Sequence, residues 1–313
     1  MLVQLTVMRD ELMLIKHLMP IWKTYADGFV FMAHNSTDGT VEYLKSIKDE
    51  YNILEIIEMN LKDEDPLIET NYRQELFDTA LKYSDKIICL DADEYLDGSW
   101  TKNDLSEHLA QNKDVKFNLR WVQYTGKNTI RAEKKWINHY TDRIGSYTKP
   151  CKYKPRYNHA EHIPSPSGGI KQIKPEQLYI AHLQWLNKRY VAIKQYYWKI
   201  SDYVQHQLHN VKILNSKSYD KSVNNFQWEE TYFKDSLKVP CDIYDNRLES
   251  ENYRVKYIVK NTEKYNIPNL GDWGFKIDGV PNKEYSFLPN ISIGVPVVFA
   301  IIYIMLIMYE GQA

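Results

Sequence analysis

The segment from Lys86 to Leu96 reads Lys-Ile-Ile-Cys-Leu-Asp-Ala-Asp-Glu-Tyr-Leu. Its first part, Ile87 to Leu90, is a short apolar run rich in β-branched residues, which is typical of a strand buried on both faces. The run ends abruptly in Asp91, Asp93 and Glu94. Because open α/β sheets bind ligands outside the carboxyl ends of their strands, this order of residues favours a ligand site here.

Asp91 and Asp93 form an Asp-x-Asp pair at the end of that predicted strand. Two carboxylates that close repel each other unless a cation lies between them, and hard divalent ions such as Mg²⁺ and Mn²⁺ favour oxygen ligands. The pair therefore predicts a divalent metal site. A bare Asp-x-Asp is common in proteins, and the alternative is a strand followed by a solvated acidic turn.

Strand and helix patterns alternate through the chain before this segment. Apolar runs predict strands at 2–8, 29–33, 53–59 and 87–90, and helical spacing predicts helices after Asp10, near 41–48 and at 71–83. This alternation is typical of an α/β fold with a doubly wound, mostly parallel sheet. No Gly-x-Gly-x-x-Gly follows the first strand and no Gly-x-x-x-x-Gly-Lys occurs, which argues against a dinucleotide-binding fold and a P-loop enzyme.

Four short motifs follow or accompany these elements in series. They are Arg9-Asp10-Glu11, Asn35-Ser36-Thr37-Asp38-Gly39-Thr40, Tyr72-Arg73-Gln74 and Asp91-Ala92-Asp93-Glu94. Each motif is weak alone, but their order and spacing across residues 1–100 resemble the family 2-type glycosyltransferases with a GT-A fold. The resemblance implies a metal-dependent enzyme that moves a sugar from a nucleotide-sugar donor to a hydroxyl acceptor on a glycan, lipid or protein.

The resemblance also implies roles for individual residues. Asp93 would bind Mn²⁺ or Mg²⁺, and Asp91 would act in catalysis beside the metal and contact the donor. Further donor contacts are implied for Arg9, Glu11, Asn35, Asp38 and Arg73. The chemistry agrees, because a divalent cation stabilises the charge that develops on a leaving nucleoside diphosphate. The alternatives are a helix cap for Asp38 and a surface cation for Arg73.

Two positions depart from the family pattern. The family usually carries an acidic residue shortly before the Ser-Thr-Asp run, facing the nucleobase, whereas Ala33 and His34 stand there in this chain. The nucleobase of the donor is therefore left open.

Two candidate residues come later in the chain. Residues 158–164 contain two histidines and Glu161, which is a candidate general base together with Glu229 and Glu230. A polar loop is the alternative at 158–164, and a zinc site lacks further ligands at regular spacing. A strand predicted at 178–183 contains His182. The resemblance implies that His182 is a further metal ligand. The alternative is a buried core histidine whose ring nitrogens are hydrogen-bonded within the protein.

Four regions organise the chain. We predict a nucleotide-sugar-binding half at 1–100, an acceptor-side half at 101–186, a helical extension at 187–285 and an apolar segment at 286–313. Residues 286–309 carry no charge, and at ~1.5 Å per residue such a helix approaches the ~30 Å of bilayer hydrocarbon. We expect a single C-terminal membrane anchor with the catalytic domain in the cytoplasm and no signal peptide. A hydrophobic segment folded against the domain is the alternative.

Composition excludes some partners and compartments. Lys and Arg number 40 against 41 Asp and Glu, so no net field favours nucleic acid. The three cysteines are scattered, and Cys89 falls in the predicted buried strand, which favours a reducing compartment without a disulfide framework.

Two other functions are compatible with the motifs. Haloacid-dehalogenase-like phosphatases carry Asp-x-Asp after an apolar strand, with the first Asp as nucleophile. There the pair normally follows the first strand of the domain and precedes a small or hydroxyl residue, whereas here it follows the fourth strand and precedes Glu94. A catalytically inactive, GT-A-like binding module is the other alternative.

Overall fold

The computed structural model describes residues 1–60, 69–156, 160–209, 228–230, 237–243 and 253–265. A curled, nine-stranded sheet forms its centre, in the order β3-β2-β1-β4-β8-β6-β10-β5, with β9 added beside β6. The strands are β1 (Val3–Met8), β2 (Gly28–His34), β3 (Ile53–Met59), β4 (Lys86–Cys89), β5 (Glu94–Asp97), β6 (Val115–Gln123), β8 (Tyr140–Ser146), β9 (Ile170–Gln172) and β10 (Tyr179–His182). The sheet is mostly parallel, as predicted.

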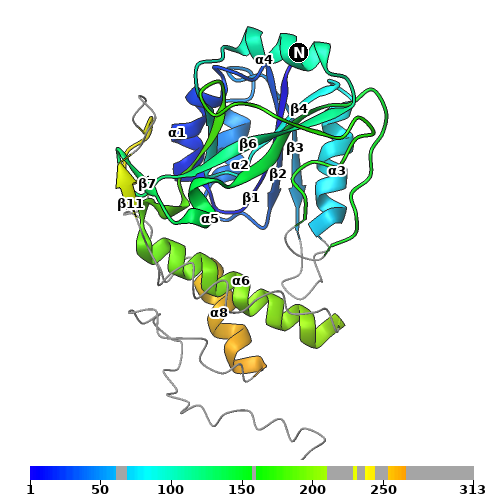
Figure 1. Cartoon of the computed structure of the whole chain (residues 1–313). Coiled ribbons are helices and arrows are strands. Elements are labelled where there is room, and N and C mark those ends of the chain that lie inside the picture. Colours follow the sequence, from blue (N-terminus) through cyan, green and yellow to red (C-terminus); the bar gives the residue numbers. More distant parts are fainter. Residues whose placement is uncertain (61–68, 157–159, 210–227, 231–236, 244–252, 266–313) are drawn as a thin grey trace, which may run out of the picture.

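Two faces of this sheet are covered, because its first strands are apolar on both sides. Along β2, Phe29 and Phe31 enter one core cluster with α1, α2 and α4, whereas Val30 and Met32 enter a second cluster with α3. Alternate residues of a strand point to opposite faces, so β2 is buried between two layers of helices (Figure 1). These helices are α1 (Leu12–Trp22), α2 (Thr40–Ser46), α3 (Glu69–Leu81) and α4 (Lys102–Gln111).

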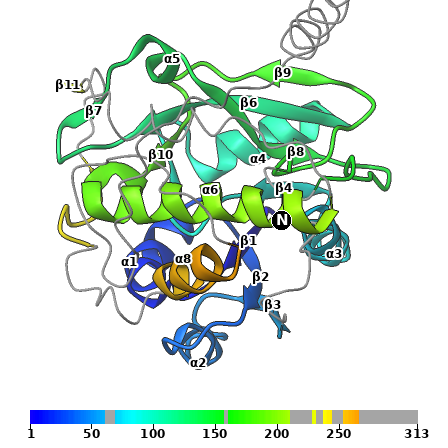
Figure 2. The same ribbon diagram turned by 90° about the horizontal axis from the view of Figure 1, so that it is seen from below.

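Two further helices lie across one edge of the sheet. Helix α6 (Lys188–His209) follows a short 3-10 turn η1 (Gln184–Leu186) and packs against α8 (Tyr253–Lys264). Figures 1 and 2 show that α6 runs beneath the carboxyl ends of the parallel strands, with α8 beside it. The remaining elements are α5 (Lys134–Ile137) and a small sheet of β7 (Thr129–Arg131) and β11 (Trp228–Glu230). The extension predicted from the sequence therefore begins as a helical cover over this edge.

Strand β8 is the main departure from the predicted arrangement. We predicted a mostly parallel sheet, but β8 lies inside it antiparallel to both β4 and β6. Its pattern is not apolar because Arg143 and Ser146 are buried there. The buried arginine has a buried acidic partner, and a pattern of apolar residues alone does not reveal such a strand.

Two residues mark the ends of helix α1. Pro20 lies within its last turn, and the helix continues to Trp22. Asp10, just before the helix, has a backbone φ of +53°, and its side chain accepts a hydrogen bond from the backbone N–H of Thr37. Among the described residues, no helix combines the length and the apolar character that a membrane span needs. The anchor predicted at 286–313 lies outside those residues.

Candidate functional site

The candidate site lies where the order of the parallel strands reverses. Strand β1 is flanked by β2 on one side and by β4 on the other, so the carboxyl ends of β1 and β4 border the topological switch point. In open α/β sheets this is the position at which ligands bind. Arg9 and Glu11 follow β1, residues 35–40 follow β2, and Asp91 and Asp93 follow β4. Arg73 of α3 reaches Asp91 as well, so the fold brings all four motifs to one edge.

Asp91 is surrounded by basic side chains. Its Oδ2 lies 3.1 Å from His162 Nε2 and 3.6 Å from Arg143 Nη2, and its Oδ1 lies 3.6 Å from Arg73 Nη2. Burial alone would raise the pKa of Asp91, but these three partners hold it well below its usual value. Asp91 is therefore an ionised carboxylate at neutral pH.

Asp93 is buried more deeply, with its side chain 6% exposed. Its Oδ2 accepts a hydrogen bond of 2.7 Å from the ammonium of Lys194 on α6 and lies 3.4 Å from His182 Nε2. Burial would raise the pKa of Asp93, but Lys194 and His182 hold it far below its usual value. In turn, Asp93 raises the pKa of Lys194 against the effect of burial, so the pair is ionic.

The donor atoms beside Asp93 suit a divalent cation. His182 Nδ1 contacts Gln123 Oε1 while its Nε2 lies 3.4 Å from Asp93 Oδ2, so the imidazole ring is held with Nε2 toward the carboxylate. No group of three or more His, Cys, Asp or Glu side chains among the described residues is arranged to hold a metal alone. Mg²⁺-type sites often use one or two protein ligands together with substrate phosphates, and Asp93 and His182 fit that pattern.

Glu94 braces the turn that carries both aspartates. It is fully buried and forms a bidentate ion pair with Arg143, at 2.8 Å from Nε and 2.7 Å from Nη2. Trp121 Nε1 donates to the same carboxylate at 2.7 Å, and the backbone N–H of Asp91 donates at 3.0 Å. The position of Asp91 is therefore set by a charge-assisted network that joins β4, β5, β6 and β8.

Residues after β1 face helix α8. Glu11 is buried, and its carboxylate lies 3.2 Å from Arg254 Nη2 of α8. The Arg9 and Arg254 guanidinium carbons lie 4.1 and 4.5 Å from the centre of the Tyr253 ring. Such cation–π contacts add to the ion pair and fix α8 against the end of β1.

The turn after β2 is held by Asp38. Its carboxylate accepts hydrogen bonds of 3.0 Å from the backbone N–H groups of both Leu12 and Thr40, so it joins the N-termini of α1 and α2. Asn35 at the start of the turn has a φ of +49°. Asp38 thus binds the first N–H group of each helix although Gly39 is the N-cap residue of α2, and donor contacts by Asn35 and Asp38 stay predictions.

His34 ends β2 and stacks on Tyr72 of α3 with 6.2 Å between the ring centroids. Its Nδ1 is a buried atom without a hydrogen-bond partner among the described residues. Burial, with Arg9 and Arg254 as further causes, lowers the pKa of His34 to about 3. His34 is therefore a neutral ring at physiological pH.

Arg73 and Glu161 have different surroundings. The side chain of Arg73 is 9% exposed and pairs with Glu69 at 2.6 Å as well as with Asp91, so the interpretation as a surface cation is wrong. Glu161 accepts from Lys116 at 3.3 Å and from Ser165 at 3.2 Å. It is the neighbouring His162, not Glu161, that reaches Asp91. A role for Glu161 as general base stays a prediction.

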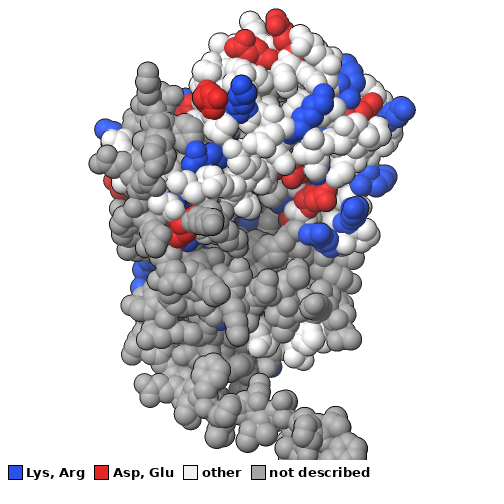
Figure 3. Space-filling view, in the orientation of Figure 1, with Lys and Arg blue, Asp and Glu red and all other residues white. Residues whose placement is uncertain are grey.

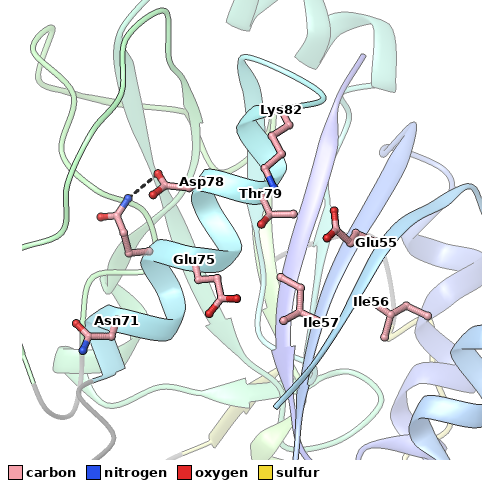
Figure 4. Close-up of a pocket in the computed structure, with 9 residues that line it drawn as sticks. Glu55, Ile56, Ile57, Asn71, Glu75, Asp78, Thr79 and Lys82 are labelled. Carbon is pink, nitrogen blue, oxygen red and sulfur yellow. Dashed lines mark hydrogen bonds between the residues drawn. The ribbon is translucent and has the colours of Figure 1, made fainter.

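A groove of about 600 Å³ lies elsewhere, between α3 and β3. Figure 4 shows its acidic lining, in which Glu55, Glu75 and Asp78 accompany Lys82. None of the predicted site residues lines it.

The molecular face in Figure 3 carries interspersed basic and acidic residues. Its described part therefore has no electrostatic field of a single sign that would indicate a charged partner.

The sequence matches no protein-family model and no curated protein. Among solved structures, the chain is similar to HddC from Yersinia pseudotuberculosis at 13% identity and a TM-score of 0.33, with 58% of this chain and 94% of that chain covered. It is similar to a Bacillus anthracis protein assigned as a glucose-1-phosphate thymidylyltransferase (9% identity, TM-score 0.28, 74% and 89% covered). It is also similar to mannose-1-phosphate geranyltransferase from Thermus thermophilus (11%, 0.22, 73% and 75%). TM-scores this low support no inference about function.

Proposed function

We propose that this chain is a glycosyltransferase that binds a nucleotide-sugar at the carboxyl edge of β1 and β4 and transfers the sugar to a hydroxyl acceptor. The observation that carries the proposal is the ionised pair at the switch point, in which Asp93 is buried and Asp91 half-buried, with His182 beside it. Carboxylates so placed are expensive to bury unless cations complete the site.

The charges at this edge match a metal and a diphosphate that enter together. The ion pairs join five carboxylates to four basic side chains: Glu11, Glu69, Asp91, Asp93 and Glu94 with Arg73, Arg143, Lys194 and Arg254. A diphosphate dianion alone would add negative charge beside Asp91 and Asp93. A divalent cation cancels that addition, so joint binding leaves the net charge of the site unchanged.

Asp93 and His182 would hold Mn²⁺ or Mg²⁺, with Asp91 next to them. The ion would stabilise the charge on the departing nucleoside diphosphate. Arg73 and Arg143 add fixed positive charge around Asp91, and Glu94 keeps that carboxylate in place. In an inverting reaction a carboxylate would also remove the acceptor proton, and Glu161 is the proposed base.

The acceptor is proposed to be a hydroxyl of a glycan, lipid or protein. Attachment to a membrane through 286–313, with the site in the cytoplasm, is a further proposal. Fractionation of cells that express the full chain or a chain ending at residue 285 tests this attachment. The full chain is expected in the membrane fraction and the shorter chain outside it; equal partition of the two would contradict the attachment.

Calorimetric titration tests the donor site. UDP, GDP and CMP are titrated into the full chain with Mn²⁺ and with EDTA, and the best nucleotide is then titrated into Asp93→Ala. We expect metal-dependent affinity for one nucleotide, and we expect its loss in the variant. Equal metal-dependent affinity in both proteins would remove Asp93 from the site, and no binding of any nucleotide by the parent chain would contradict the proposed function.

A further inference from the structure

Lys194 is the one side chain of the extension that reaches Asp93 among the contacts of the described residues. It comes from α6, more than 100 positions along the chain from the aspartate. Its side chain is 16% exposed and that of Asp93 6%, so the pair is shielded from water. The attraction within such a pair is screened much less by solvent ions than that within an exposed pair.

The same oxygen of Asp93 faces two different partners. Oδ2 lies 2.7 Å from Lys194 Nζ and 3.4 Å from His182 Nε2. A divalent ion bound between Asp93 and His182 would therefore lie against the lysine ammonium. Like charges at this separation repel strongly in a buried site, so the ion and Lys194 cannot share that oxygen.

Lys194 differs from the arginines of the site in how freely it can change its ion-pair partner. Arg143 is fixed in a bidentate fork on Glu94, and Arg73 is fixed on Glu69. Lys194 is a point charge on a flexible stem with three donors, so it can turn from one anion to another nearby. The diphosphate of a donor is the anion that arrives with the metal.

We propose that Lys194 is a donor-site cation that neutralises Asp93 in the donor-free protein and moves to the diphosphate when a divalent ion takes its place on Asp93. This inference rests on the proposed function. It makes metal and nucleotide binding mutually dependent: the metal displaces Lys194, and the nucleotide accepts it. It also gives α6 a role in the site, because a donor then draws this helix onto its phosphates.

Electron paramagnetic resonance of free Mn²⁺ tests the exchange without any turnover. The full chain is compared with Lys194→Met, Lys194→Arg, Asp93→Asn and the control Lys113→Met, which breaks an exposed 2.7 Å pair with Asp85 away from the site. Mn²⁺ is titrated alone and then with UDP or GDP. Thermal unfolding confirms that each variant is folded.

Without nucleotide, we expect Lys194→Met to bind Mn²⁺ about tenfold more tightly than the parent chain, a coupling within the usual range for linked sites. Lys113→Met should bind it as the parent chain does, Lys194→Arg should bind it no more tightly than the parent chain because a cation stays on Asp93, and Asp93→Asn should lose it. With nucleotide, Lys194→Met should show a smaller gain in Mn²⁺ affinity than the parent chain shows.

The results separate this inference from the proposed function. Equal Mn²⁺ affinity of Lys194→Met and the parent chain, with nucleotide binding intact, would overturn the exchange and leave the proposed function standing. A parent chain that binds neither Mn²⁺ nor nucleotide would overturn both. If Lys194→Met does not fold, Lys194→Gln serves in its place, and unchanged Mn²⁺ affinity there contradicts the exchange equally.

Discussion

Replacing Arg143 by Met should destabilise the fold more than any exposed charge substitution. Glu94 is fully buried, and Arg143 supplies two of its contacts at 2.7 and 2.8 Å. Removing one partner of a buried ion pair leaves the other charge uncompensated, which costs about 3–5 kcal/mol. Trp121 and the Asp91 N–H still donate to Glu94 after the change, so we expect a value toward the lower end, about 3 kcal/mol.

Urea unfolding followed by circular dichroism measures this cost, with Lys113→Met as the control. The Lys113–Asp85 pair is of equal length but 46% and 41% exposed, so its loss should cost about 1 kcal/mol or less. The double variant Arg143→Met/Glu94→Gln should recover part of the loss, because it removes the buried charge as well. A cost below about 1 kcal/mol for Arg143→Met would refute the claim that Glu94 is a buried carboxylate dependent on this arginine.

Three further predictions concern other residues. The pKa of His34 falls to about 3 on folding, so the unfolded chain binds a proton that the folded chain does not, and the free energy of unfolding should fall as pH falls from about 6.5 toward 3, by up to about 1.4 kcal/mol per pH unit. Urea unfolding of a His34→Phe variant should lack that part of the pH dependence. An identical slope in the variant would be evidence against a buried neutral ring. Burial raises the pKa of the Cys89 thiol to about 12, so iodoacetamide should label the exposed Cys241 in the native protein and Cys89 only after unfolding. Peptide mass mapping locates the label. Labelling of Cys89 in the native protein would contradict its position in the core. Gly169→Ala should cost about 1 kcal/mol, because the φ of Gly169 is +79° and the space around it is open. Gly98→Ala should cost at least twice as much in the same urea assay, because the added Cβ would collide with the backbone oxygen of Gln177. Equal costs would show that the backbone at Gln177 moves aside without a penalty.

The parts of the site that could be predicted from the sequence are those that follow a strand directly. Asp91 and Asp93 come after an apolar run, and His182 ends another, so their positions follow from the rule that parallel strands carry functional side chains at their carboxyl ends. The helix at 188–209 was likewise predictable, because its apolar residues recur at helical spacing.

The partners of these residues could not be predicted in the same way. Arg143, His162, Lys194 and Arg254 reach the site from β8, from the segment before β9 and from two helices of the extension. Nothing local in the sequence marks a long basic side chain that folds back across such distances. The one available signal for Arg143 is an arginine within an otherwise strand-like run, which indicates a buried acidic partner once the strand is known to be central.

A crystal of the full chain soaked with Mn²⁺ and a nucleoside diphosphate tests the central claim most directly. The account predicts an anomalous manganese peak between Asp93 and His182, with the diphosphate bound to the metal and Lys194 Nζ moved from the aspartate onto a phosphate oxygen. Manganese and nucleotide found together at another place on the molecule, with the 2.7 Å contact between Lys194 and Asp93 intact, would contradict it.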